Sequence, residues 1–236
     1  LEYMPENPYR VLSTPQFSAA DIAEAERLSS AFDLFYNRGK AVPWFAMILK
    51  PLAMRPSEFF AAFAVWLASV PGAAGGDVID LQRRFLIYIF MQRKLPQSWG
   101  EIASDIATYF GHTGRIIEDC DDFIEASNTA PYVLNPLSSF AEFSHNPLEL
   151  AQHVFSGVGN FAELEKLLTA KRYSTLLFLD ADNEIDIRFL SEEKIELLKQ
   201  ARNGLRKMPQ DAALKRFVRT CIEDGILIDR SSEMQK

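Results

Sequence analysis

Apolar residues recur three and four positions apart through most of the first half of the chain, which is the spacing of one face of an α-helix. A first helix is predicted to begin after Ser18, whose hydroxyl can serve as the N-cap with Asp21 three residues on, and to end near residues 37–39. Further helices are predicted over residues 43–51, 56–70 and 77–94. The last of these is apolar around so much of its circumference that we expect it to be central.

Another helix is predicted from the sequence SWGE at residues 98–101. Ser98 and Glu101 match a capping box, in which each side chain hydrogen-bonds to the backbone amide of the other residue. The pattern is predicted to be interrupted at residues 111–114, which include two glycines, and to resume through residue 124.

The clearest strand signals lie in the second half. The helical spacing of apolar residues stops after Asn128, and a short strand-like run follows at residues 132–134. Residues 174–179 and 185–190 are apolar runs separated by the turn-forming sequence DADNE, so they are predicted to pair as a hairpin. The end of the chain, where a helix is followed by a glycine and an apolar strand, resembles the closing part of a winged-helix fold.

Together these patterns predict a mainly α fold, in which an N-terminal helical domain precedes a smaller α/β domain with a β-hairpin and a winged-helix-like end. We place the boundary after Asn128, so that the helical domain covers residues 16–128 and the α/β domain covers residues 129–236. Residues 1–15 are expected to be extended, because three prolines restrict the backbone there.

The amino-acid composition argues against some classes of function. The 236 residues are 48% hydrophobic and 24% charged, which is enough to bury a core, and the net charge of -7 argues against a nucleic-acid-binding surface. The two cysteines are far apart and favour a reduced, cytoplasmic protein. The longest apolar runs, residues 59–70 and 85–91, are shorter than the roughly 20 residues of a membrane-spanning helix, so we interpret them as buried helices.

The start of the chain carries the most specific pattern. The sequence NPYRVLSTP at residues 7–15 is followed by a predicted helix that ends in LFYNR at residues 34–38. This pair of segments resembles the region just after the barrel in cobalamin-binding radical S-adenosylmethionine proteins, where an extended Tyr-x-Val-Leu-Ser-Thr segment enters a helix ending in Tyr-Tyr-Asn. The matching residues are Tyr9, Leu12, Ser13, Thr14, Tyr36 and Asn37. The likeness extends through the sequence PSEFF at residues 56–60 and fades beyond residue 67.

The resemblance implies that the chain is the C-terminal accessory region of such an enzyme. Residues 1–15 would be a linker from a missing upstream barrel, and the first residue, Leu1, is what an excised fragment would show. The parent protein would cleave S-adenosylmethionine reductively to a 5′-deoxyadenosyl radical, or use cobalamin to carry a methyl group. The partners would be the barrel and the cobalamin-binding domain of the same polypeptide, and the six motif residues would have a structural or docking role.

The cofactors implied for the parent have no predicted ligands in this chain. A [4Fe-4S] cluster of the family needs a Cys-x3-Cys-x2-Cys motif, and the isolated Cys120 and Cys221 cannot supply it. We also find no Asp-x-His-x-x-Gly pattern for cobalamin. Cluster, S-adenosylmethionine and cobalamin are therefore assigned to upstream sequence, and we predict no catalytic, cofactor-binding or metal-binding residue here.

Histidines and carboxylates offer weaker candidates. No two of His112, His145 and His153 share the i, i+4 spacing of a zinc site, and we interpret the first as part of a solvated interruption between helical segments. The sequence EDCDD at residues 118–122 could pair two carboxylates for acid-base work, as in a hydrolase. A hydrolase also needs a nucleophile and a positioned base, which we do not find, so we interpret this run as a solvated helix face.

An alternative function belongs to another class. The aromatic residues Phe59, Phe60, Phe63 and Trp66 recur like a core stripe, but they could also line the groove of a free-standing helical interaction or regulatory module. The two hypotheses differ in one expectation. A domain that docks on a barrel should expose an apolar patch around residues 9–14 and Tyr36, whereas a self-contained module should cover it.

Overall fold

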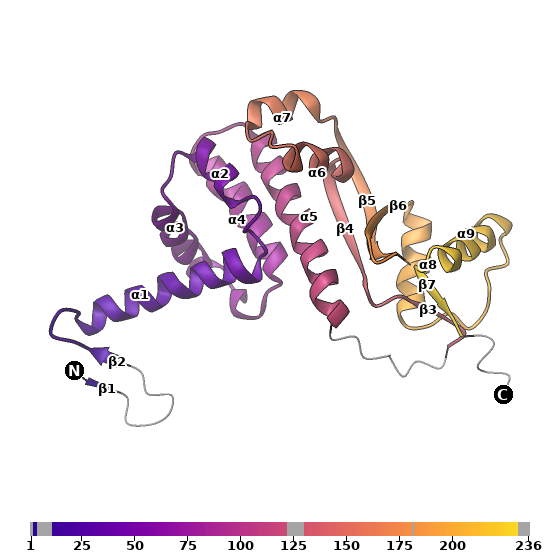
Figure 1. Cartoon of the computed structure of the whole chain (residues 1–236), viewed down its shortest axis with the longest axis horizontal. Coiled ribbons are helices and arrows are strands. Elements are labelled where there is room, and N and C mark those ends of the chain that lie inside the picture. The colour runs from indigo at the N-terminus through magenta and orange to yellow at the C-terminus, as the bar shows by residue number, and fades with distance from the viewer. Residues whose placement is uncertain (1, 4–10, 122–129, 181, 231–236) are drawn as a thin grey trace. The chain divides into compact units, whose positions relative to one another are not determined.

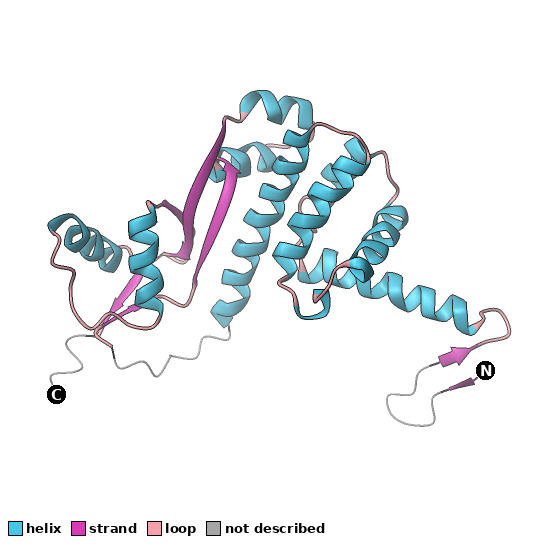
Figure 2. Cartoon of the chain, turned by 180° about the vertical axis from the view of Figure 1, so that it is seen from behind, coloured by secondary structure: helices cyan, strands magenta, loops and turns pink. Residues whose placement is uncertain are grey.

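The computed structural model of the chain describes residues 2–3, 11–121, 130–180 and 182–230. The fold is mainly α with a smaller α/β part, as predicted (Figure 1, Figure 2). Contacts divide the chain into two compact units. The first comprises residues 1–107 and 159–161, and the second comprises residues 108–158 and 162–236. The boundary predicted after Asn128 lies outside the described residues, so the division into residues 1–15, 16–128 and 129–236 stays a prediction.

The first unit is helical apart from one short antiparallel pair of strands. Strands β1 (Glu2–Tyr3) and β2 (Val11–Ser13) pair with each other. They precede α1 (Ala19–Phe32), the π-helix η1 (Asp33–Arg38), α2 (Phe45–Leu52), α3 (Pro56–Ser69), the 3-10 turn η2 (Ala73–Gly75) and α4 (Val78–Gln92). The helices expected over residues 43–51, 56–70 and 77–94 are all present, within two residues at each end.

An aromatic cluster forms the core of this unit. The ring of Phe35, which is fully buried, makes edge-to-face contacts with Phe59 at 4.9 Å and Phe63 at 5.1 Å between ring centroids. Further ring contacts to Phe35 come from Trp44, Phe45, Phe60 and Phe85. Phe59, Phe60 and Phe63 are buried and Trp66 is half-buried, so the predicted aromatic stripe serves as core.

The central position predicted for the helix over residues 77–94 is reflected in α4. Asp77 caps it by accepting a hydrogen bond from the amide of Ile79 at 3.0 Å. Phe85 and Leu86 are fully buried, and so is the polar side chain of Gln82. The outer side of the helix remains exposed at Met91.

Helix α5 (Gln97–Asp121) differs from the prediction in two ways. It begins one residue early, so Ser98 lies in its first turn, and Gln97 Nε2 donates to Glu101 Oε1 at 2.7 Å. The interruption expected at residues 111–114 is wrong, because the helix is continuous there. Glycine costs about 1 kcal/mol in a helix, a penalty that burial of neighbouring side chains such as Ile116 outweighs.

The expectation that His112 lies in a solvated interruption is therefore also wrong. His112 is half-buried on α5, and its Nδ1 lies 2.7 Å from Oγ of Ser139 on β4 (Ser138–His145). The hydroxyl of the adjacent residue, Thr113, donates to the carbonyl oxygen of Tyr109 in the same helix, at 2.9 Å. The contact of His112 with Ser139 joins the second half of α5 to β4.

The second unit is built on an antiparallel sheet in the order β4-β5-β6. Strands β5 (Ala170–Leu179) and β6 (Ile185–Phe189) form the predicted hairpin. At its turn, Asp180 Oδ1 accepts hydrogen bonds from the amides of Asp182 and Glu184, at 2.9 and 2.8 Å. Strand β4, which pairs with β5 along almost its whole length, was not predicted.

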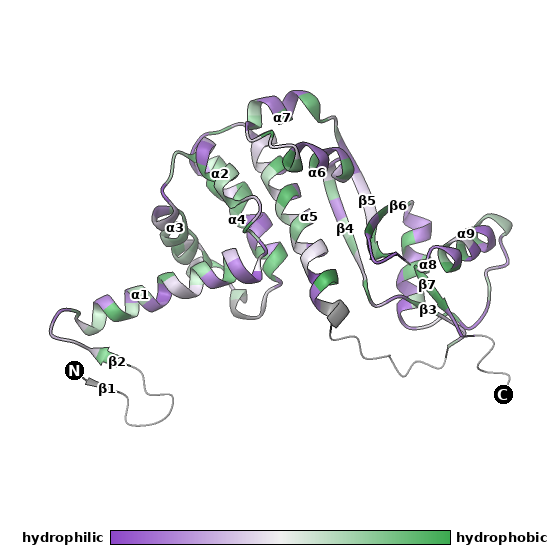
Figure 3. Cartoon of the chain, in the orientation of Figure 1, coloured by the Kyte–Doolittle hydropathy of each residue, from purple (hydrophilic) through white to green (hydrophobic). Residues whose placement is uncertain are grey.

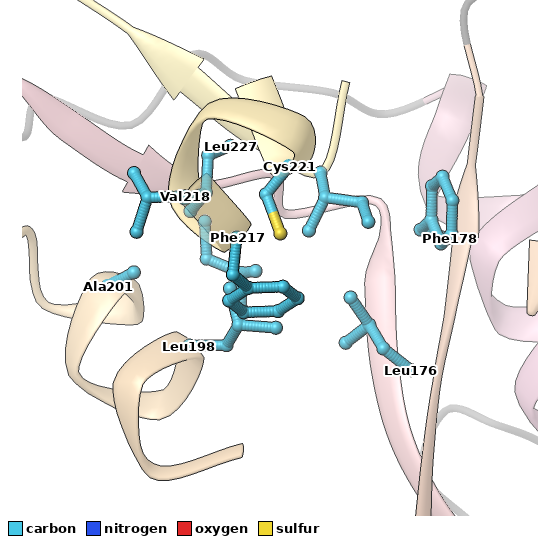
Figure 4. Close-up of a cluster of buried hydrophobic side chains, with 10 residues drawn as sticks. Leu176, Phe178, Leu198, Ala201, Phe217, Val218, Cys221 and Leu227 are labelled. Carbon is cyan, nitrogen blue, oxygen red and sulfur yellow. The ribbon is translucent and has the colours of Figure 1, made fainter. Parts of the chain in front are cut away.

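Successive residues of β5 face opposite sides of this sheet, and each side is covered differently. Leu176 and Phe178 face α8 (Glu192–Arg202) and α9 (Ala212–Glu223), where the buried Phe217, Val218 and Cys221 pack against them (Figure 4). Leu177 and Leu179 face the other way and pack in a cluster that contains Ile116 of α5.

Short elements complete the second unit. Helix α6 (Pro147–Phe155) has Asn146 as its N-cap, and α7 (Phe161–Leu167) follows it. Strand β3 (Tyr132–Leu134), at the predicted position, pairs antiparallel with the last strand, β7 (Leu227–Asp229). The winged-helix-like character of this end stays a prediction.

Candidate docking surface

The N-terminal half of α1 carries no buried side chain. Every residue over positions 19–30 is exposed or half-buried, and Ala31 is the first buried residue of the helix. Within its unit, the helix extends beyond α2, α3 and α4, with β2 near its free end (Figure 1, Figure 2). About three turns of helix are therefore presented to solvent on most sides.

Exposed apolar side chains occur within this part of the chain and just before it. The side chain of Phe17 is 59% exposed, Leu12 is 43% exposed and Val11 is 36% exposed. The half-buried Ile22 and the exposed Ala25 follow at helical spacing, and hydrophobic and hydrophilic bands alternate along α1 (Figure 3). We refer to Val11, Leu12, Phe17, Ile22 and Ala25 as the α1 surface.

An open hollow of about 700 Å³ lies along this surface. Phe17, Ile22 and Ala25 contribute its apolar lining. The remaining lining residues are polar or acidic: Gln16, Asp21, Glu24, Glu26 and Ser29. The hollow is open to solvent, and we call its apolar lining residues the floor and its acidic lining residues the rim.

The N-terminus of α1 is fixed by the predicted cap. The amide of Asp21 donates to Ser18 Oγ at 3.2 Å, and Asp21 Oδ2 accepts from the Ser18 amide at 2.9 Å, so a full capping box is present. Hydrogen bonds from the Ser18 hydroxyl and amide lower the pKa of Asp21 below its ordinary value of 3.8. Asp21 therefore stays ionised at the edge of the hollow.

Thr14 shapes the chain between β2 and α1. Its Oγ1 accepts hydrogen bonds from the amides of Gln16 and Phe17, at 3.2 and 2.9 Å, and its own amide donates to the Phe17 carbonyl oxygen at 2.9 Å. This turn holds Phe17 next to the first turn of the helix. The role of Thr14 in this chain is to position the apolar side chain that lines the hollow.

Tyr36 and Asn37 lie at the other end of the helix, in η1. Tyr36 is half-buried, and its ring stacks on that of Phe32 with 5.0 Å between ring centroids. The backbone carbonyl oxygen of Tyr36 accepts a hydrogen bond from the amide of Ala41 at 2.9 Å. Asn37 Nδ2 donates to Asp33 Oδ1 at 3.0 Å. The contacts of these two residues are internal to the unit.

The structure does not bring the six predicted motif residues together. The 14 residues of α1 separate Leu12, Ser13 and Thr14 from the η1 pair by about 21 Å of helix. Leu12 is exposed, Ser13 and Thr14 are half-buried, and Tyr9 lies outside the described residues. Of the apolar patch expected around residues 9–14 and Tyr36 for a docking domain, Val11 and Leu12 are exposed, whereas Tyr36 is half-buried.

Sequence reasoning did not single out Phe17 or the acidic rim. Ile22 and Ala25 lie three residues apart, which is helical spacing, but this spacing does not tell whether a helix face is covered. The combination that could have indicated the surface is an aromatic residue just before an N-cap, followed by apolar positions flanked by Glu24 and Glu26.

The described residues that could take part in metal binding or acid-base chemistry are not gathered at one site. Within the part of the chain that the structure describes, no group of three or more His, Cys, Asp or Glu side chains is arranged to hold a metal ion. Cys221 is fully buried, and burial raises the pKa of its thiol to about 12, which disfavours the thiolate needed for ligation. Of the acidic run at residues 118–122, Glu118 is exposed and Asp122 lies outside the described residues.

Residues 1–70 match a family model described as "Protein of unknown function (DUF4080)". The matched part ends at Val70, which is the C-cap of α3, and contains the α1 surface and η1. No curated protein matches the chain. None of the described helices is both long enough and apolar enough to cross a membrane.

Proposed function

We propose that this chain is the C-terminal accessory region of a cobalamin-binding radical S-adenosylmethionine enzyme, and that it docks on the upstream barrel through the α1 surface. The observation that carries the proposal is the exposure of Val11, Leu12 and Phe17 directly at the segment that resembles the junction after the barrel. Contiguous apolar side chains left in water typically mark a contact surface. The accessory region would shape, cover or assemble the active site.

The cofactors of the parent enzyme are assigned to upstream sequence, because the residues of this chain do not fit them. Two cysteines cannot provide the three thiolates of the family's cluster motif, and Cys221 is sealed within the core between α9 and β5. The chain therefore has no catalytic centre of its own under this proposal.

The first experiment compares this chain with a longer polypeptide extended upstream along the natural reading frame. Both are purified without oxygen and analysed for iron, sulfide and cobalt. We expect iron and sulfide near a [4Fe-4S] stoichiometry in the longer protein alone, with cobalt testing the cobalamin assignment. A reading frame that begins near residue 1, or a longer protein without a cluster, would favour the free-standing interaction module instead.

A second experiment tests the docking role of the α1 surface. Phe17→Ser in the longer protein is expected to loosen the contact with the barrel and increase proteolytic cleavage between the two parts. Phe155→Ser is the matched control, since Phe155 is also exposed, at 68%, but belongs to the second unit. Equal cleavage of both variants and the unmodified protein would count against docking through α1.

A further inference from the structure

The rim of the hollow along α1 is acidic and has little compensating positive charge. Asp21, Glu24 and Glu26 line it, and among the residues that the structure describes no lysine or arginine does. Glu24 pairs with Arg27 on the same helix, with both side chains more than half exposed. Glu26 forms no ion pair with any described residue. The surface thus combines an apolar floor with an acidic edge on which the charge of Glu26 has no ion-pair partner among the described residues.

We propose that this hollow receives an apolar segment flanked by lysine or arginine, supplied by the upstream barrel. This inference rests on the proposed function and adds the chemistry of the contact. An apolar side chain of the segment would lie against Phe17, Ile22 and Ala25, while its cations would face Glu24 and Glu26. Complementary charge at the rim of an apolar contact selects the partner and its orientation.

Under the proposed function, the pairing of β1 with β2 brings the junction with the barrel close to the α1 surface. Glu2 pairs with Ser13 and Tyr3 pairs with Val11, so the chain that enters from the upstream side runs beside the start of the α1 surface. A barrel joined there is held close to the hollow, at an effective concentration in the millimolar range for a short tether. A contact of modest intrinsic strength is then sufficient for docking.

The test uses hydrogen exchange of backbone amides over residues 11–32, measured by mass spectrometry in the longer polypeptide and in this chain. We expect slower exchange in the longer polypeptide, because docking suppresses local opening of α1. In Glu26→Lys the protection is expected to fall by roughly threefold to tenfold, as for the reversal of a partly exposed charge. Raising the salt concentration to 1 M should weaken the unmodified contact in the same direction.

Two further variants make the outcome decisive. Ala25→Glu places a charge on the apolar floor and should abolish the protection, whereas the exposed position 25 leaves the fold of α1 intact. Glu223→Lys, at the exposed C-terminal end of α9, is the control and should leave the exchange of α1 unchanged.

The results separate this inference from the function on which it rests. A longer protein that binds the cluster but shows the same α1 exchange as this chain overturns the inference and leaves the accessory role standing. Protection that Glu26→Lys does not reduce overturns the charge complementarity. Protection that appears in this chain alone and increases with concentration assigns the hollow to a second copy, which also overturns the inference.

Discussion

The side chain of Gln82 fills the space where Gly39 would carry a β-carbon. Gln82 Nε2 donates to the carbonyl oxygens of Gly39 at 2.9 Å and Phe35 at 2.8 Å. A β-carbon on Gly39 would lie 2.1 Å from that nitrogen. Gly39 has an ordinary φ of -81°, so glycine is required there for space and not for backbone conformation.

Gly39→Ala is expected to destabilise the chain by about 1–3 kcal/mol, since the added methyl group forces a backbone shift in a packed region. The added carbon would also lie 2.3 Å from the carbonyl oxygen of Phe35, so shortening Gln82 would not relieve the strain. Urea denaturation measures the change. Gly75→Ala is the control, because no heavy atom lies within 4 Å of its β-carbon position. Equal effects of the two substitutions would contradict the prediction.

Gln82→Glu is expected to be more damaging than Gln82→Met. The carboxylate would face two carbonyl oxygens with no proton to donate, and breaking a buried polar arrangement in this way costs about 3–5 kcal/mol. Methionine only removes the two hydrogen bonds, at about 1–3 kcal/mol. The free energies of unfolding of the two variants are compared at neutral pH. A glutamate variant as stable as the methionine variant would contradict the expected repulsion between the carboxylate and the two carbonyl oxygens.

The N-terminal turn of α1 is expected to loosen in acid. The hydrogen bonds from Ser18 lower the pKa of Asp21, so they contribute stability above its ordinary value of 3.8 and lose it as the pH falls through the lower, folded value. NMR chemical shifts of residues 18–24 should therefore lose helical character below about pH 4. In Ser18→Ala, which lacks the hydroxyl, a weaker pH response is expected. An identical response would mean that another group controls this turn.

The buried thiol of Cys221 is expected to make the chain sensitive to alkali. Burial raises its pKa from 9.0 to about 12, so between these values the folded protein keeps a proton that the unfolded chain loses. Stability is therefore retained below pH 9 and lost as the pH rises, with a slope of up to about 1.4 kcal/mol per pH unit. Urea denaturation at pH 8 and pH 10 should show a smaller loss in Cys221→Ala. Cys120→Ser controls for the other cysteine.

Phe17→Ser is expected to change the stability of this chain by less than about 0.5 kcal/mol, because the side chain has no part in the core. The same change at the buried Phe35 should cost about 3–5 kcal/mol. Binding of a hydrophobic dye should fall in Phe17→Ser, since the exposed apolar area shrinks. A large loss of stability in that variant would show that Phe17 is packed in solution.

Local signals were the most reliable part of the sequence. The cap at Ser18 was predicted because it depends on a side chain and an amide three residues away. Strand β4 was missed for the opposite reason: its sequence, SSFAEFSH, is largely polar, and its pairing with β5 decides its conformation. The continuity of α5 past Gly111 was likewise set by tertiary packing and not by residue propensity.

The candidate docking surface likewise combines features that the sequence could predict with features that depend on tertiary packing. The segment entering α1 could be recognised from its sequence, and so could the end of the helix at Asn37. Whether other residues cover Ile22 and Ala25 could not be predicted from the sequence, because burial of a helix face depends on the other elements of the fold. The contact of Gln82 with Phe35 and Gly39 joins residues more than 40 positions apart and has no local signature.

The π-helix η1 determines in which direction α1 presents its apolar side. A π-helical turn holds one residue more than an α-helical turn, and each residue of an α-helix advances the side chains by about 100° around the axis. Converting Asp33–Arg38 to regular α-helix without deleting a residue would rotate Phe17, Ile22 and Ala25 by about that angle relative to the rest of the aromatic cluster around Phe35. The phase between the inner core and the outer surface of this unit thus depends on the π-helical hydrogen bonding of η1.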